Sequence, residues 1–180
     1  MIGRAGATAL KAACVCACAA LGFVLLQEPV RALEAGASIA ILHAFGADSV
    51  LAVANTTVLV APRQGAAFDV LITPSCSSLA SILALGCLSP LTPWRPLARR
   101  IAATGTATGL IAAGNVLRIA GSIAVGIVAG RSSLVLFHDW VGSMFTFVYT
   151  MGGYIVMLAL LLPRSAGPYV RANGLVPHAV

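Results

Sequence analysis

Three residues with chemically capable side chains, Cys76, Arg118 and His138, lie within or beside apolar stretches of the chain. A thiol and a histidine together can supply the nucleophile and the general acid–base of a cysteine enzyme. An arginine keeps its charge and offers five fixed N–H donors, which suit an oxyanion or a substrate carboxylate. A guanidinium in an apolar segment is costly and normally marks a functional site. The three residues predict a catalytic centre, provided that the fold brings them together.

The composition is that of a membrane protein. Of 180 residues, 59% are hydrophobic and only 9% are charged, a balance typical of chains embedded in lipid. The net charge of +6 comes without a basic or aromatic-rich stripe, so membrane lipid is expected as a partner and nucleic acid is not. The five cysteines form no CxxC pair with histidine partners, which argues against a metal site and a disulfide framework. No cofactor is expected.

The apolar runs predict an all-α integral membrane fold, organised as a single domain over residues 1–180, with about four transmembrane helices. The first run is interpreted as a retained helix, because no small-x-small cleavage site follows it. In the third, the spacing of Gly105 and Gly109 predicts close helix contact. The expected spans are residues 8–26, 76–91, 101–129 and 139–162.

The remaining segments are expected outside the hydrocarbon. Residues 31–46 have a helical pattern but are short for a span and carry charge, which favours an interfacial helix. Residues 47–73 contain β-prone runs with turn residues between them, and a strand edge cannot sit in lipid, so they predict a small outer cap. Residues 130–137 are expected to be a short loop, and residues 163–180 a polar tail on the inner side.

The charges predict an orientation. With the N-terminus inside and four spans, all five acidic residues fall on the outer side, whereas the inner side holds cations alone. This partition satisfies the positive-inside rule and places both termini in the cytoplasm. The cations assigned to the inner side are Arg4, Lys11, Arg95, Arg99, Arg100, Arg164 and Arg171.

Orientation brings the three reactive residues to one depth. Cys76 and His138 begin the second and fourth spans at their outer ends. Arg118 follows Arg100 by 18 residues, or roughly 27 Å of helix, within a hydrocarbon layer about 30 Å thick. All three are therefore expected near the outer boundary, where a helix N-terminus would also favour the Cys76 thiolate.

Other polar residues could complete the site. Asn115 and Ser122 share a helix face with Arg118, and Asn115 could orient the arginine or donate to substrate. Asp139 could cap the fourth helix or orient His138. Ser77, which is next to Cys76, is with Asn115 and Asp139 a candidate for substrate binding.

Each catalytic candidate also has a purely structural interpretation. A membrane cysteine is often a packing residue, and a histidine at the interface is often merely solvated. Arg118 could be a salt-bridge partner of Asp69 or Asp139.

Three short blocks resemble the signature blocks of the exosortase/archaeosortase family. They are Thr73-Pro74-Ser75-Cys76-Ser77-Ser78-Leu79, Asn115-Val116-Leu117-Arg118-Ile119, and Phe137-His138-Asp139 followed by Gly142.

The resemblance covers residues 66–153 and implies a multi-pass membrane cysteine peptidase or transpeptidase. Such an enzyme would process C-terminal sorting signals of exported proteins at the outer face of the cytoplasmic (inner) membrane, often beside exopolysaccharide loci. It would give Cys76 the role of nucleophile, His138 that of acid–base, and Arg118 a role toward the transition state or substrate.

The chain departs from the family pattern in two respects. Ser78 stands where the family commonly has glycine, and about four spans are expected where many members have about eight. Two rival functions remain at this stage: a non-enzymatic assembly factor of an exopolysaccharide export system, and a small anion transporter or channel subunit. The transporter is disfavoured because no second charge continues through the third span.

Overall fold

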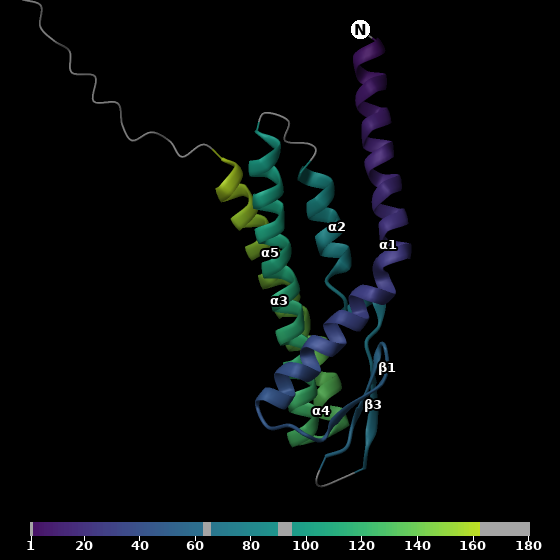
Figure 1. Cartoon of the computed structure of the whole chain (residues 1–180), viewed down its shortest axis with the longest axis vertical. Helices are drawn as coiled ribbons and strands as arrows, with labels where there is room; N and C mark the ends of the chain where they lie inside the picture. The colour runs from purple at the N-terminus through teal and green to yellow at the C-terminus, as the bar shows by residue number, and fades with distance from the viewer. Residues whose placement is uncertain (1, 63–65, 90–94, 163–180) are drawn as a thin grey trace, which may run out of the picture.

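The structure is a computed structural model that describes residues 2–62, 66–89 and 95–162, so the predicted tail at 163–180 lies outside the described residues. Three helical stretches are long and apolar enough to cross a membrane, which makes this a membrane protein. They rise side by side, with a small sheet at one end (Figure 1). The elements are α1 (Ile2–Ala44), β1 (Val50–Ala54), β2 (Thr57–Val60), β3 (Phe68–Leu71), the 3₁₀ turn η1 (Pro74–Cys76), α2 (Leu79–Leu88), α3 (Leu97–Ala129), α4 (Arg131–Leu136), the π-helical turn η3 (Phe137–Val141) and α5 (Gly142–Leu161).

Helix α1 joins two elements that the sequence predicted to be separate. The expected span at 8–26 and the expected interfacial helix at 31–46 form one continuous helix with Pro29 inside it. The helix bends along its length (Figure 1), which is the usual effect of an interior proline that removes one hydrogen bond without ending the helix. Beyond the proline, Ala35, Ile39 and Leu42 are buried in the core, so this half packs on protein instead of lying on the membrane surface.

Helix α2 is much shorter than the span predicted over residues 76–91. It has ten residues, or about 15 Å of helix, half the thickness of a hydrocarbon layer of about 30 Å. Cys76 does not begin this helix but lies in η1 before it. Because residues 90–94 are outside the described residues, three candidate spans are described where about four were expected.

Helices α3 and α5 form a close antiparallel pair. Gly130, with φ +84°, reverses the chain after α3, and the expected loop at 130–137 is instead α4 running into η3 and α5. A Cβ on Gly114 would lie 2.7 Å from the Tyr149 side chain, and one on Gly153 would lie 2.8 Å from Ile111. These glycines permit the tight helix contact.

The glycines predicted to make that contact do not make it. Neither Gly105 nor Gly109 has any non-local atom within 4 Å of an added Cβ. The prediction for this pair was wrong, because the face of α3 that meets α5 carries Gly114 instead.

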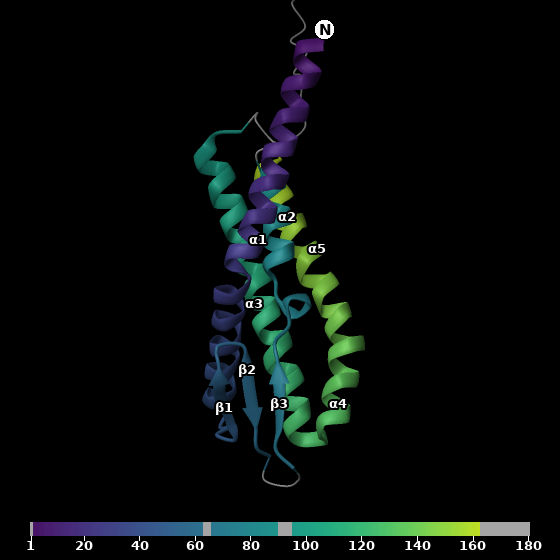
Figure 2. The ribbon, with the colours of Figure 1, turned by 90° about the vertical axis from the view of Figure 1, so that its right-hand side faces the viewer.

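The predicted β-prone cap is a three-stranded antiparallel sheet in the order β1-β2-β3. Its inner face, with Val50, Val58 and Val60 fully buried, packs on the second half of α1 and on Ile123 of α3. The sheet lies alongside the ends of α3 and α4 (Figure 2). It leaves β3 as the edge strand nearest α4.

Basic residues gather at the opposite end of the bundle from the sheet. The Nε of Arg95 donates to the carbonyl of Leu161 at 2.7 Å, and the Nε of Arg99 donates to that of Leu160 at 2.8 Å. Cations here satisfy the free carbonyls at the end of α5 and complement its dipole. The start of α1 and the end of α5 lie at this same end (Figure 1).

Candidate active site

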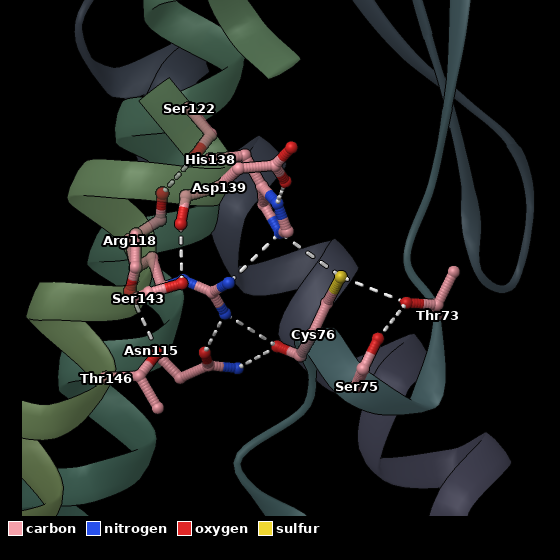
Figure 3. A network of polar contacts seen from close by, with 11 residues as sticks. Thr73, Ser75, Cys76, Asn115, Arg118, Ser122, His138, Asp139, Ser143 and Thr146 are labelled. Atoms are coloured by element: carbon pink, nitrogen blue, oxygen red, sulfur yellow. Dashed lines mark hydrogen bonds and ion pairs between the residues drawn. The ribbon is translucent and has the colours of Figure 1, made fainter. Parts of the chain in front are cut away.

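The three reactive side chains meet at one atom. His138 Nε2 lies 3.3 Å from Cys76 Sγ and 3.0 Å from Arg118 Nη2, and Figure 3 shows the two contacts converging on the imidazole ring. The residues come from η1, α3 and η3, which are far apart in the sequence. The convergence predicted from helix depth is therefore present at hydrogen-bonding distance.

Side chains of α3 hold the η1 turn that carries Cys76. Asn115 Nδ2 donates to the Cys76 carbonyl at 2.9 Å, and Arg118 Nη1 makes a longer contact to the same oxygen at 3.4 Å. Both donors approach the backbone of the nucleophile from one helix face (Figure 3). Since α2 begins only at Leu79, a helix N-terminus is not what stabilises the thiolate, contrary to expectation.

His138 lies in the π-helical turn η3, within an otherwise α-helical rod. Such insertions re-aim side chains and are frequent at functional sites. The ring's Nδ1 lies 3.2 Å from the Asp139 Oδ1, so of the two roles considered for Asp139 the geometry favours orienting the histidine. The Asp139 side chain is 64% exposed, which leaves that contact screened by water.

The arginine contact identifies the histidine tautomer. A guanidinium can donate but cannot accept, so Nε2 must accept the hydrogen bond from Arg118 Nη2. The ring proton then lies on Nδ1, facing Asp139. In this state Nε2 carries no proton and lies 3.3 Å from Cys76 Sγ, within reach of the proton that the thiol loses.

The thiol of Cys76 is prepared for ionisation. Its partial burial alone would raise the pKa, but the hydrogen bonds that the sulfur forms with His138 and then Thr73 outweigh burial and lower the pKa of Cys76 to about 7. Thr73 Oγ1 lies 3.1 Å from Sγ. A thiol with such a pKa is substantially ionised at neutral pH and is a competent nucleophile.

Arg118 is buried and has no anionic partner. Its exposed fraction is 7%, and the ion pairs among the described residues do not include it. Its acceptors are neutral, and its Nε has no partner at all. The interpretation of Arg118 as a salt-bridge partner of Asp69 or Asp139 therefore does not fit the geometry.

Gly142 makes room for the guanidinium. A Cβ on Gly142 would lie 2.8 Å from Arg118 Nε, closer than real side-chain contacts allow. The glycine that follows the His138 block therefore lets α5 approach α3 over the arginine.

Asn115 is fully buried, and all of its described bonds are to protein. Its Nδ2 donates to the Cys76 carbonyl. Its Oδ1 accepts from Tyr149 Oη at 2.9 Å and from Arg118 Nη1 at 3.4 Å. This fits the role of orienting the arginine better than that of binding substrate. Ser77, the other predicted substrate contact, accepts from the Leu79 amide at 3.3 Å at the start of α2.

Glu34 supports the nucleophile loop and was missed as a site residue. Its Oε1 accepts from the Ser78 hydroxyl at 2.6 Å and from the Ser78 amide at 3.0 Å, and both residues are buried. The Ser78 side chain therefore binds α1. An acid on a helix that is otherwise mostly apolar was the signal in the sequence, but its partner lies 44 residues away.

A cavity of about 300 Å³ opens beside Cys76 and His138. Cys76, His138 and Asp139 line it at one end, and β3, α3 and α4 form its walls. Its volume is at the small end of the range for ligand pockets.

Within the described part of the chain, no three His, Cys, Asp or Glu side chains are grouped as a metal site would require. Comparisons with protein families, with curated proteins and with solved structures returned no match to this chain.

Proposed function

We propose that this protein is a membrane cysteine peptidase or transpeptidase of the exosortase/archaeosortase type, processing C-terminal sorting signals of exported proteins. The observation that carries the proposal is the junction of Cys76 Sγ, His138 Nε2 and Arg118 Nη2 beside an open cavity. Nucleophile, proton acceptor and cation are present together, as covalent acyl transfer requires.

The first half-reaction forms a thioester. His138 Nε2 takes the thiol proton, and Cys76 Sγ attacks the scissile carbonyl carbon. As Nε2 becomes protonated it can no longer accept from Arg118, so the Nη2 donor is released toward the oxyanion that forms next to the sulfur. When the intermediate collapses, the C–N bond breaks and the proton on Nε2 passes to the leaving amine.

The second half-reaction releases the product. Water, in hydrolysis, or an acceptor amine, in transfer, gives a proton to Nε2 and attacks the thioester carbonyl. The C–S bond then breaks, and the proton returns to the sulfur. The missing counter-ion of Arg118 supports this cycle, because the thiolate and the oxyanion are the anions that the site itself generates.

The proposed orientation places the site at the outer face of the cytoplasmic membrane, with the N- and C-termini inside. Arg95 and Arg99 lie at the end of the bundle opposite the sheet, which agrees with the positive-inside rule. Arg118 is 21 residues beyond Leu97, the first residue of α3, or about 32 Å along a helix. That is close to the thickness of a hydrocarbon core, so the site would open at its outer boundary.

The test is a comparison of protein C-termini in cells that carry wild-type protein or Cys76→Ala. Mass spectrometry of exported proteins should find C-terminal apolar helices removed in the wild type and retained in the variant. Cys87→Ala is the matched control, since Cys87 lies in α2 outside the network. Identical C-termini in all strains would reject the proposal.

These strains, with an Arg118→Ala strain added, test the rival assembly-factor function. If the protein only supports an exopolysaccharide export system, Cys76→Ala should leave export intact, whereas disruption of Arg118 should reduce the amount of folded protein.

A further inference from the structure

The cavity beside Cys76 runs along an unpaired strand edge. Because the Ile72 amide donates to the Thr56 carbonyl at 2.9 Å, Ile72 and Val70 direct their main-chain groups toward β2. Alternation in an antiparallel pair then points those of Asp69 and Leu71 away from β2. The cavity is lined by Phe68, Asp69, Val70, Leu71 and Ile72 on one side and by α4 on the other.

Both walls of this groove lead to the catalytic pair. Strand β3 runs from Phe68 toward Cys76, and α4 runs from Arg131 toward His138. The two elements lie next to each other at the sheet end of the molecule, with the β3 arrow pointing toward the rest of the bundle (Figure 2). The groove is about four residues long, the length of β3, or roughly 13 Å of extended chain.

The floor of the groove is apolar. Ile119 and Ile123 of α3 and Leu134 of α4 line it, and they extend the hydrophobic surface on which the sheet rests. A strand placed beside β3 would direct every second side chain onto this floor and the others away from it. The groove therefore fits an extended peptide with apolar residues at alternate positions.

We propose that the substrate segment preceding the scissile bond binds here as an added strand, parallel to β3. The direction rests on the proposed function, in which the substrate is anchored by a helix that follows the scissile bond. Residues before that bond must then come from the sheet side and approach Cys76 in the same sense as β3. Main-chain hydrogen bonds to Asp69 and Leu71 would hold the segment, as in other strand-addition complexes.

The test compares two probes of opposite polarity with one sequence, a four-residue peptide of alternating valine and alanine. One probe is acetylated and ends in a chloromethyl ketone, and the other begins with a chloroacetyl group and ends in an amide. In each, Sγ displaces chloride and forms a thioether, and the thiol proton is lost to His138. Rates of labelling at Cys76 in the full-length protein are measured by mass spectrometry and divided by each probe's rate with glutathione.

We expect the chloromethyl ketone probe to label Cys76 about tenfold faster after this correction, the size of effect that two main-chain hydrogen bonds produce. Leu71→Pro, which removes an outward N–H at a position where an edge strand tolerates proline, should abolish the preference. Ala52→Pro is the matched control. By the same alternation, the main-chain groups of Ala52 point away from β2, and β1 is the opposite edge of the sheet. Methylation of the probe's amide nitrogens, which leaves the protein unchanged, should also abolish it.

The outcomes separate the two proposals. Equal rates, a preference for the chloroacetyl probe, or rates unaffected by N-methylation would overturn parallel strand addition. Chloroacetamide, too small to use the groove, reports on the nucleophile alone. If its reaction with Cys76 does not depend on His138, the proposed function fails, and the strand proposal fails with it.

Discussion

Replacing His138 by alanine should change the ionisation of Cys76 in a calculable way. In the wild type, burial raises the pKa of Cys76, but the hydrogen bonds of the sulfur with His138 and Thr73 outweigh burial and hold the pKa at about 7. The variant loses the largest of the favourable contributions but keeps most of the burial. We therefore expect the pKa of Cys76 in His138→Ala to rise to that of an ordinary thiol, about 8.5, or above.

The size of the change depends on two opposing effects. At pH 7, a rise from about 7 to about 8.5 lowers the ionised fraction from about one half to about 3%, roughly fifteenfold. The more basic thiolate is intrinsically more nucleophilic, by about fivefold over this interval for a Brønsted coefficient of about 0.4–0.5. The rate at pH 7 should fall only about threefold, so the midpoint of the pH profile is the diagnostic quantity.

The assay is alkylation of Cys76 by iodoacetamide between pH 5.5 and 10 (about the range in which a thiol ionises), followed on the peptide that contains it. Wild-type reactivity should rise with pH around a midpoint of about 7, because a lowered pKa keeps the thiolate down to that pH. Thr73→Val should raise the midpoint less than His138→Ala. His43→Ala is the control, since the His43 side chain forms its described hydrogen bond with the Val50 carbonyl, outside the site. A wild-type midpoint of about 8.5, or an unchanged midpoint in His138→Ala, would refute this account of the site.

Three further substitutions test the supports of the site. Arg118→Lys keeps the charge but loses the planar fork, so peptide processing should fall while the folded protein persists; unchanged processing would remove Arg118 from the mechanism. Gly142→Ala should displace the arginine and cost about 1–3 kcal/mol of stability, measured by thermal unfolding, whereas Gly105→Ala, which meets nothing, should not destabilise. Glu34→Ala leaves two buried Ser78 donors unpaired, at about 1–3 kcal/mol each, and should lower the unfolding temperature; Glu34→Gln should restore much of it, and full stability of Glu34→Ala would contradict the support.

The convergence of Cys76, Arg118 and His138 was predictable because depth in a membrane is set by position along a helix. Counting 1.5 Å per residue from the basic end of α3 placed Arg118 near the outer boundary, and the apolar runs placed Cys76 and His138 there too. The sheet was also predictable, since β-branched runs separated by turn residues cannot lie exposed in lipid. Both inferences use only local sequence and the dimensions of the bilayer.

The supports of the site were not predictable, because they depend on partners distant in sequence. In the sequence Pro29 indicates a helix end, but α1 continues past it because Ile39 and Leu42 pack on the sheet. The sequence predicts Glu34 to be a surface charge on an interfacial helix, whereas in the structure its carboxylate accepts two hydrogen bonds from Ser78. Hydrophobic periodicity contains no information about such pairs.

The state of Arg118 is the observation that favours the catalytic interpretation of this site over a structural one. A structural arginine in a membrane protein would be expected to pair with an acid, since burying an uncompensated charge is costly. Here the described acceptors are the amide of Asn115, the ring of His138 and a backbone carbonyl, all neutral, and Nε has none. With Cys76 protonated, the described residues thus hold a buried cation without an anion, 3.0 Å from the nitrogen that would take the thiol proton. Under the proposed function, the oxyanion would supply the missing charge, so this arginine would favour the charged intermediate over the uncharged starting state.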